Sequence, residues 1–184
     1  MAMESLIRQL EEAGIADDTV IVISPDHYPY ALERSATWGN DENYLTELYG
    51  VTEMDRFTRD SNALIIWSGC LEDKNLKVET PVYSLDILPT LSNLFGLDYD
   101  SRLLVGRDVF SDTEPLVLWP EYSWKTDKGT YDSGSRTFTP AEGVEVDDSY
   151  VDRIKAIVSN KISYSREVQN LKYFQVLSDF LNGK

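Results

Sequence analysis

The 184-residue sequence predicts a mixed α/β fold with a small antiparallel part towards its C-terminus. Two apolar runs, Thr19 to Ile23 and Ala63 to Trp67, are rich in β-branched residues and are typical of buried strands. Helical patterns precede and separate these runs, and such alternation of helix and strand favours an α/β sheet.

Two helical patterns accompany the first strand. Apolar side chains recur at helical spacing from Leu6 to Ala13, and Gly14 follows as a C-terminal stop. After a loop over residues 28–40, Asp41 is expected to cap a further helix that stops at Gly50.

A third helix is predicted from Ser84 to Phe95, with Gly96 as its stop. Pro89 is tolerated best in the first turn of a helix, so Asp86 is the expected N-cap. A carboxylate there accepts backbone N–H groups that have no partner inside the helix. We therefore favour a structural role for Asp86.

The pattern changes in the last third of the chain. Leu116 to Trp119 predicts a short strand. From Glu121 to Asp147, residues typical of strands alternate with residues typical of turns, a pattern that predicts β-hairpins. The remaining residues are helical, with a break expected at Asn160 to Ser163. Residues 1–112 are thus expected to form an α/β sheet region, and residues 113–184 a small antiparallel subdomain with C-terminal helices.

Composition excludes several classes of protein. A net charge of −15 argues against nucleic-acid binding, which depends on clustered lysine and arginine. One cysteine, Cys70, permits no internal disulfide. No apolar stretch approaches the roughly 20 residues that span a bilayer, so the chain itself is expected to be soluble. Because it opens directly into a helical pattern, we expect a fragment of a longer protein.

The dipeptide Asp26-His27 follows the first predicted strand and contains the only histidine. Open α/β sheets place their chemistry just past the carboxyl ends of such strands. A carboxylate oxygen and an imidazole nitrogen suit zinc or manganese, but a catalytic site uses about three protein ligands. The alternative interpretation is a capped turn with a surface histidine.

Other candidates are weaker. Ser24 has no second histidine to serve as its base, and Cys70 lies beside acidic residues that do not activate a thiol. Three arginines are able to clamp a phosphate or a carboxylate: Arg34, Arg102 and Arg107. Four aromatic residues suggest a sugar-stacking face, although packing in a core is their favoured role: Trp119, Tyr122, Trp124 and Tyr131.

Several ordered segments carry a resemblance to a known family. In chain order they are Gly14 to Val22, Asp26-His27-Tyr28, Ala63 to Trp67, Ser84 to Gly96 and Gly106 to Phe110. Together they resemble the lipoteichoic acid synthase family, the sulfatase-like phosphoglycerol transferase branch of the alkaline phosphatase superfamily. The resemblance continues to the helical tail and covers nearly the whole chain.

This resemblance implies a metal-dependent enzyme that uses manganese or magnesium. Its threonine nucleophile takes glycerophosphate from phosphatidylglycerol and passes it to a growing polymer. Its catalytic domain lies outside the bacterial cell membrane, anchored by N-terminal membrane helices. By position in the motif, Asp26 and His27 resemble the two late metal ligands.

The family's nucleophile, early acidic ligand and substrate-binding histidines belong to a region upstream of Met1. The resemblance therefore implies that residues 1–112 are the C-terminal part of the catalytic domain. It also implies no catalytic residue in this chain, weak or absent metal binding and no activity when alone. Its implied partners are the missing N-terminal half of the catalytic domain and, for the parent enzyme, a lipid-phosphate substrate. Exposed sheet edges would also allow a homodimer.

Two alternatives remain open. One is a fragment of a sulfatase or phosphodiesterase from the same superfamily, since the upstream nucleophile distinguishes these enzymes. The other is a non-catalytic module that binds glycan or a protein partner through its aromatic residues, among them Trp124.

Overall fold

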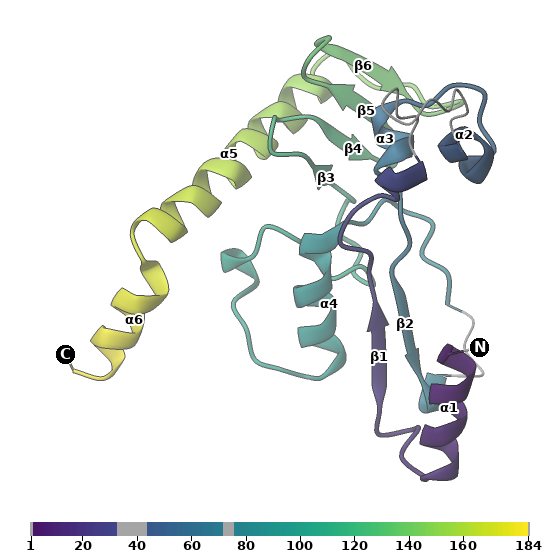
Figure 1. The fold of residues 1–184 in the computed structure, drawn as a ribbon. Helices are drawn as coiled ribbons and strands as arrows, with labels where there is room; N and C mark the ends of the chain where they lie inside the picture. The colour runs from purple at the N-terminus through teal and green to yellow at the C-terminus, as the bar shows by residue number, and fades with distance from the viewer. Residues whose placement is uncertain (1, 33–43, 72–75, 184) are drawn as a thin grey trace. The chain divides into compact units, whose positions relative to one another are not determined.

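The computed structural model describes residues 2–32, 44–71 and 76–183 (Figure 1). The chain divides into two compact units, residues 1–76 and 77–184, and each is described by itself. The boundary expected after residue 112 stays a prediction. Two other expectations, the helix cap at Asp41 and the role of Arg34, lie outside the described residues.

The first unit contains a two-stranded sheet. β1 (Val20–Ile23) and β2 (Ile65–Ser68) pair antiparallel, with Val20 opposite Ser68 and Ile23 opposite Ile65. Both strands confirm the apolar pattern of the sequence. They are less buried than that pattern predicts, since Ile23 is 38% and Ile65 51% exposed. The physical reason is that the sheet has only these two strands among the described residues.

Helices of the first unit end where the sequence predicts. α1 (Ala2–Glu12) precedes Gly14 at φ 68°, and α2 (Tyr44–Tyr49) precedes Gly50 at φ 66°. Glycine adopts this left-handed conformation without steric penalty, which makes it a common helix stop. The other short helices among the described residues of this unit are η1 (Tyr30–Leu32), α3 (Arg56–Arg59) and η3 (Gly69–Leu71).

The second unit begins with a helical segment and ends with a sheet and two helices. η4 (Ser84–Asp86) continues into α4 (Ile87–Leu94), and η5 (Ser101–Leu103) follows. The sheet has the order β3-β4-β5-β6, and all its pairings are antiparallel, as the sequence predicts. Its strands are β3 (Val117–Leu118), β4 (Trp124–Thr126), β5 (Gly129–Asp132) and β6 (Thr137–Pro140).

The core of the second unit lies between this sheet and α5 (Tyr150–Asn170), which crosses it (Figure 1). Trp124 is fully buried, and its ring stacks on Tyr131 with centroids 5.5 Å apart. The helix contributes one side chain per turn to the core: Tyr150, Ile154, Val158 and Ile162. This spacing is that of one helix face.

The break expected at Asn160 to Ser163 is wrong. α5 runs through these residues, because they include neither proline nor glycine and because Ile162 belongs to the buried face. The helix ends instead before Lys172, whose φ of 49° turns the chain into α6 (Tyr173–Leu181). None of the helices described has the length and apolar character needed to cross a membrane.

Candidate functional site

Asp26 and His27 lie in the loop that follows β1. Asp26 Oδ1 and His27 Nε2 are 3.5 Å apart, and the two side chains are 89% and 51% exposed. The loop leaves the end of the sheet at which Ile23 pairs with Ile65. Two different donor atoms are therefore presented together to solvent at one end of the sheet.

The other ring nitrogen of His27 has a defined partner. Nδ1 lies 2.7 Å from the carbonyl oxygen of Tyr28, which only accepts hydrogen bonds. When Nδ1 carries the ring proton it donates to this carbonyl, and Nε2, 3.5 Å from Asp26 Oδ1, then keeps its lone pair. Metal-binding histidines commonly donate their second N–H to a carbonyl or carboxylate in this way.

The donor atoms of this pair suit a divalent ion. A carboxylate oxygen and an imidazole nitrogen are ligands that manganese and zinc accept, and the Nδ1 hydrogen bond leaves the required lone pair on Nε2. Two donors alone hold an ion weakly. In the part of the chain that the structure describes, no group of three or more His, Cys, Asp or Glu residues could hold a metal ion.

An aromatic side chain packs on His27, and a cationic side chain packs on its neighbour Tyr28. The ring of Tyr30 lies 4.6 Å from that of His27, centroid to centroid. The guanidinium carbon of Arg59 lies 4.5 Å from the centroid of the Tyr28 ring. Sequence patterns did not single out Arg59, because its relation to Tyr28 exists only once α3 has packed beside the β1 loop.

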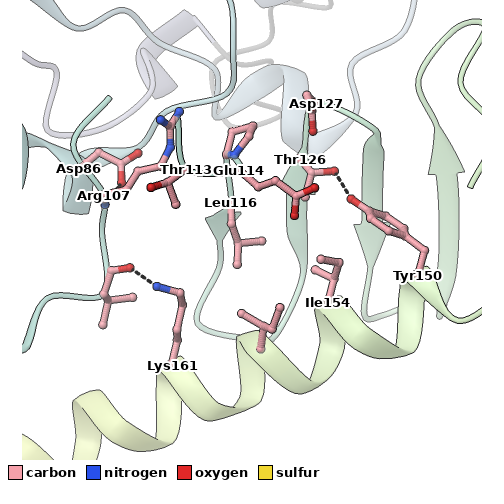
Figure 2. A pocket seen from close by; sticks show the side chains of 13 residues that line it. Asp86, Arg107, Thr113, Glu114, Leu116, Thr126, Asp127, Tyr150, Ile154 and Lys161 are labelled. Carbon is pink, nitrogen blue, oxygen red and sulfur yellow. Dashed lines mark hydrogen bonds between the residues drawn. The ribbon is translucent and has the colours of Figure 1, made fainter. Parts of the chain in front are cut away.

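The second unit contains a pocket of about 340 Å³ between α5 and the segments that lead into the sheet (Figure 2). One wall is apolar and includes Leu116, Ile154 and Ile157. Polar side chains also line the pocket, and Figure 2 shows Lys161 reaching into it from α5, where its Nζ donates to the carbonyl of Val105. The pocket therefore combines an apolar surface with a cationic group.

Asp86 lines this pocket but acts as a backbone acceptor. It is 1% exposed, and its carboxylate accepts the N–H groups of Tyr83 at 3.2 Å and Arg107 at 2.8 Å. Burial raises the pKa of Asp86, against these hydrogen bonds and the charges of Arg107 and Lys161. The structural role expected for it is confirmed, but its side chain does not cap α4 as expected, since it turns to Tyr83 and Arg107 instead.

Lys161 is held in the pocket by one backbone acceptor. Its Nζ donates to the carbonyl of Val105 at 2.7 Å. Burial lowers the pKa of Lys161, and the negative charge of Asp86 opposes that shift. Asp86 and Lys161 are thus both partly desolvated, and their opposite charges attract each other although no hydrogen bond joins the two side chains.

The two arginines and the cysteine that the sequence also offered as candidates contact neighbouring protein groups. Arg102 forms a two-pronged pair with Asp100, with distances of 2.7 and 2.9 Å. The guanidinium of Arg107 donates to the carbonyls of Asp108 and Val109 and to Thr80. Cys70 is exposed, 3.3 Å from the hydroxyl of Ser68.

Two of the four aromatic residues expected in a sugar-stacking face are buried, whereas Trp119 is partly buried and Tyr122 exposed. Trp124 is 0% and Tyr131 6% exposed, so neither ring is able to stack on a sugar. Tyr122 is exposed, and it contacts Arg166 on α5. The core role that we favoured for these aromatic residues is confirmed for Trp124 and Tyr131.

Comparison with known proteins gives a consistent set of relatives, although no protein-family model matches the chain. Lipoteichoic acid synthase 2 of Bacillus subtilis strain 168 is 25% identical over 175 residues, covering 92% of this chain. Lipoteichoic acid synthases of Staphylococcus saprophyticus and Staphylococcus aureus strain USA300 are 27% identical over 122 and 123 residues, covering 62% and 64%.

The chain is thus distantly related to proteins named lipoteichoic acid synthase, as its motifs suggest. It spans a quarter of the length of the Bacillus relative and 17% of each of the two staphylococcal relatives.

Proposed function

From this distant relationship to lipoteichoic acid synthases, we propose that the chain is the C-terminal part of the catalytic domain of a sulfatase-like phosphoglycerol transferase. The parent enzyme moves glycerophosphate from phosphatidylglycerol to a polymer of the bacterial cell envelope. Its catalytic domain lies outside the membrane to which the parent is anchored. The observation that carries the proposal is the pairing of Asp26 Oδ1 with His27 Nε2 at the end of β1.

Asp26 and His27 supply two ligands of a divalent ion, manganese or magnesium. When bound, the ion stabilises charge on the phosphoryl oxygens and helps to ionise the attacking hydroxyl. Asp26 contributes a negative charge that attracts the ion, and His27 contributes a neutral donor whose ring is oriented by Tyr28. The two residues therefore bind and orient, and they transfer no proton themselves.

The other ligands and the threonine nucleophile come from the rest of the parent enzyme. Residues 1–184 alone then bind manganese weakly and turn over no phosphodiester. The β1 and β2 strands, with partly exposed apolar side chains such as Ile65, are the surface that the N-terminal half covers. When that half is absent, the same strand edges allow the chain to pair with a second copy.

A chimera tests this function. In it, residues 1–184 replace the matching segment of the Bacillus subtilis relative, and release of diacylglycerol from phosphatidylglycerol vesicles is measured with manganese present. We expect turnover in the chimera and a loss of at least about 100-fold in its His27→Ala and Asp26→Asn variants. Asp18→Asn, which removes an exposed carboxylate before β1, is the matched control.

The same chimera distinguishes a phosphoglycerol transferase from a sulfatase or phosphodiesterase. An aryl sulfate ester and a simple phosphodiester are offered beside phosphatidylglycerol. Preference for either over the lipid would favour the sulfatase or phosphodiesterase interpretation. Full turnover of phosphatidylglycerol by the His27→Ala chimera would contradict the proposed role of the pair.

A further inference from the structure

Arg59 contacts Tyr28 although the two residues belong to separate segments of the first unit. Tyr28 follows β1, and Arg59 is the last residue of α3. In Figure 1 the segment after β1 lies beside α3, and the guanidinium carbon of Arg59 is 4.5 Å from the Tyr28 ring centroid. This is a cation–π contact, which the planar guanidinium favours.

Arg59 is itself firmly placed. Its Nε donates to Asp60 Oδ1 at 3.0 Å, and its carbonyl lies 3.1 Å from the hydroxyl of Tyr49. At the other end of α3, Asp55 accepts two backbone N–H groups at 2.8 and 3.1 Å. A helix this short depends on such caps. The guanidinium is therefore presented to Tyr28 from a fixed support.

Tyr28 connects this support to His27. The Tyr28 carbonyl, 2.7 Å from His27 Nδ1, and the Tyr28 ring are attached to the same backbone unit. A ring held against Arg59 limits rotation of that backbone, and so it limits the direction of the carbonyl. On another side, the ring of Tyr30 packs 4.6 Å from that of His27. The imidazole therefore has two neighbours that restrict it, the Tyr28 carbonyl and the Tyr30 ring, and α3 reaches the first of them through Arg59 and the Tyr28 ring.

We propose that Arg59 and Tyr28 are positioning residues that hold His27 with its proton on Nδ1 and its Nε2 lone pair available. Without them Nδ1 loses its fixed acceptor, and the neutral imidazole populates both tautomers. The value of this arrangement for an enzyme rests on the proposed function, since Nε2 is the atom offered to the ion.

The tautomer is directly measurable because the chain has one histidine. With ¹⁵N-labelled histidine, the full chain gives one pair of ring nitrogen signals, whose shifts and couplings identify the protonated nitrogen. In metal-free alkaline buffer, where imidazole is neutral, we expect the Nδ1–H form to predominate. Arg59→Ala should shift the tautomer ratio towards Nε2–H by about two- to fivefold, the range that a cation–π contact supports.

Conservative variants distinguish positioning from a general effect on folding. Arg59→Lys keeps a cation, so its tautomer ratio should lie between those of Arg59→Ala and the wild type. Tyr28→Phe keeps the ring and should have the wild-type tautomer ratio. Tyr28→Ala should reproduce the effect of Arg59→Ala, and the double variant should add little to either. If Arg59→Ala does not fold, Arg59→Gln replaces it as the uncharged variant.

Arg56→Ala is the matched control. Arg56 lies on the same helix, and its guanidinium carbon is 4.8 Å from the Phe57 ring, so the variant removes the same charge and the same kind of contact. It should leave the tautomer ratio unchanged. Predominance of Nε2–H in the wild-type chain, or an unchanged ratio when Arg59 becomes alanine or glutamine, would overturn the proposal.

Manganese titration separates this inference from the proposed function. If the chain holds the Nδ1–H tautomer but manganese does not broaden the His27 ring signals, the metal role fails and the positioning role stands. If manganese binds while the Arg59 variants keep the wild-type tautomer, the metal role stands and the positioning role fails.

Discussion

The buried carboxylate of Asp86 accepts the backbone N–H of Arg107 at 2.8 Å. This hydrogen bond joins the start of α4 to the segment that precedes the antiparallel sheet. The same carboxylate also accepts the N–H of Tyr83, at the start of η4, so it connects two stretches of the second unit. Asp86 is therefore an internal tie, a buried carboxylate that links two segments, and both Asp86 and Arg107 line the pocket.

Removing this tie should destabilise the second unit. We expect Asp86→Ala to lower the free energy of unfolding by about 1 to 3 kcal/mol, because two N–H groups lose their acceptor. Asp86→Asn should cost less, since its amide oxygen still accepts one of them. Urea unfolding gives the values, and Asp98→Ala, at an exposed position, should change them by no more than about 0.5 kcal/mol. Equal stability of Asp86→Ala and wild type would refute the tie.

The pH dependence of the free energy of unfolding in alkaline solution should show that Lys161 is buried. Burial lowers the pKa of Lys161 below its ordinary value of 10.5, so the unfolded chain binds more protons than the folded one between the two values. The contribution of Lys161 to the free energy of unfolding therefore rises with pH across that window. Lys161→Met should remove this rise.

The Lys161 comparison needs a control because Tyr83 also titrates in alkaline solution. Burial raises the pKa of Tyr83, which lowers stability as pH increases above 10. The difference between wild type and Lys161→Met isolates the lysine, and Lys155→Met on the same helix should retain the wild-type pH slope. An identical slope in Lys161→Met would contradict the assignment.

The Arg102 guanidinium lowers the pKa of the Asp100 carboxyl from 3.8 to about 2. We expect ¹³C NMR titration of the carboxyl to show this value, and Arg102→Ala to return it towards 3.8. Arg102→Lys should give an intermediate pKa, because it keeps the charge and loses the two-pronged geometry. A pKa near 2 in Arg102→Ala would require another cause. The stability from this exposed pair is present above pH 3.8 and is lost as pH falls through about 2.

Trp124 should matter for folding and not for ligand binding. Trp124→Ala removes a fully buried ring that stacks on Tyr131, and we expect it to lower the free energy of unfolding by about 3 to 5 kcal/mol. Tyr122→Ala, at an exposed aromatic position, should have a much smaller effect. A well-folded Trp124→Ala variant that had lost glycan binding would instead favour the binding module.

Local patterns predicted most elements of the fold. β1 and β2 follow from short β-branched runs, and the ends of α1 and α2 follow from Gly14 and Gly50. The antiparallel sheet follows from its alternation and turns. These signals depend on neighbouring residues, so they are readable without knowledge of the fold.

Features that depend on distant contacts were not predictable in the same way. The helix break lies at Lys172 and not at Asn160 to Ser163, because packing of Ile162 against the sheet keeps α5 intact. The partners of the Asp86 carboxylate depend likewise on how the chain returns to α4. At the candidate site, the sequence pointed to Asp26 and His27, but the tautomer and the contact from Arg59 depend on three-dimensional packing.

Manganese binding at Asp26 and His27 is the most direct test of the central claim. The ¹⁵N ring signals of the single histidine are followed while Mn²⁺ is added to the full chain. We predict selective broadening of these signals. The Asp26→Asn variant should need about tenfold or more manganese for the same broadening, whereas Asp18→Asn should need the wild-type concentration. Signals that stay sharp, or that broaden equally in the Asp26→Asn variant, would contradict a metal-ligand pair.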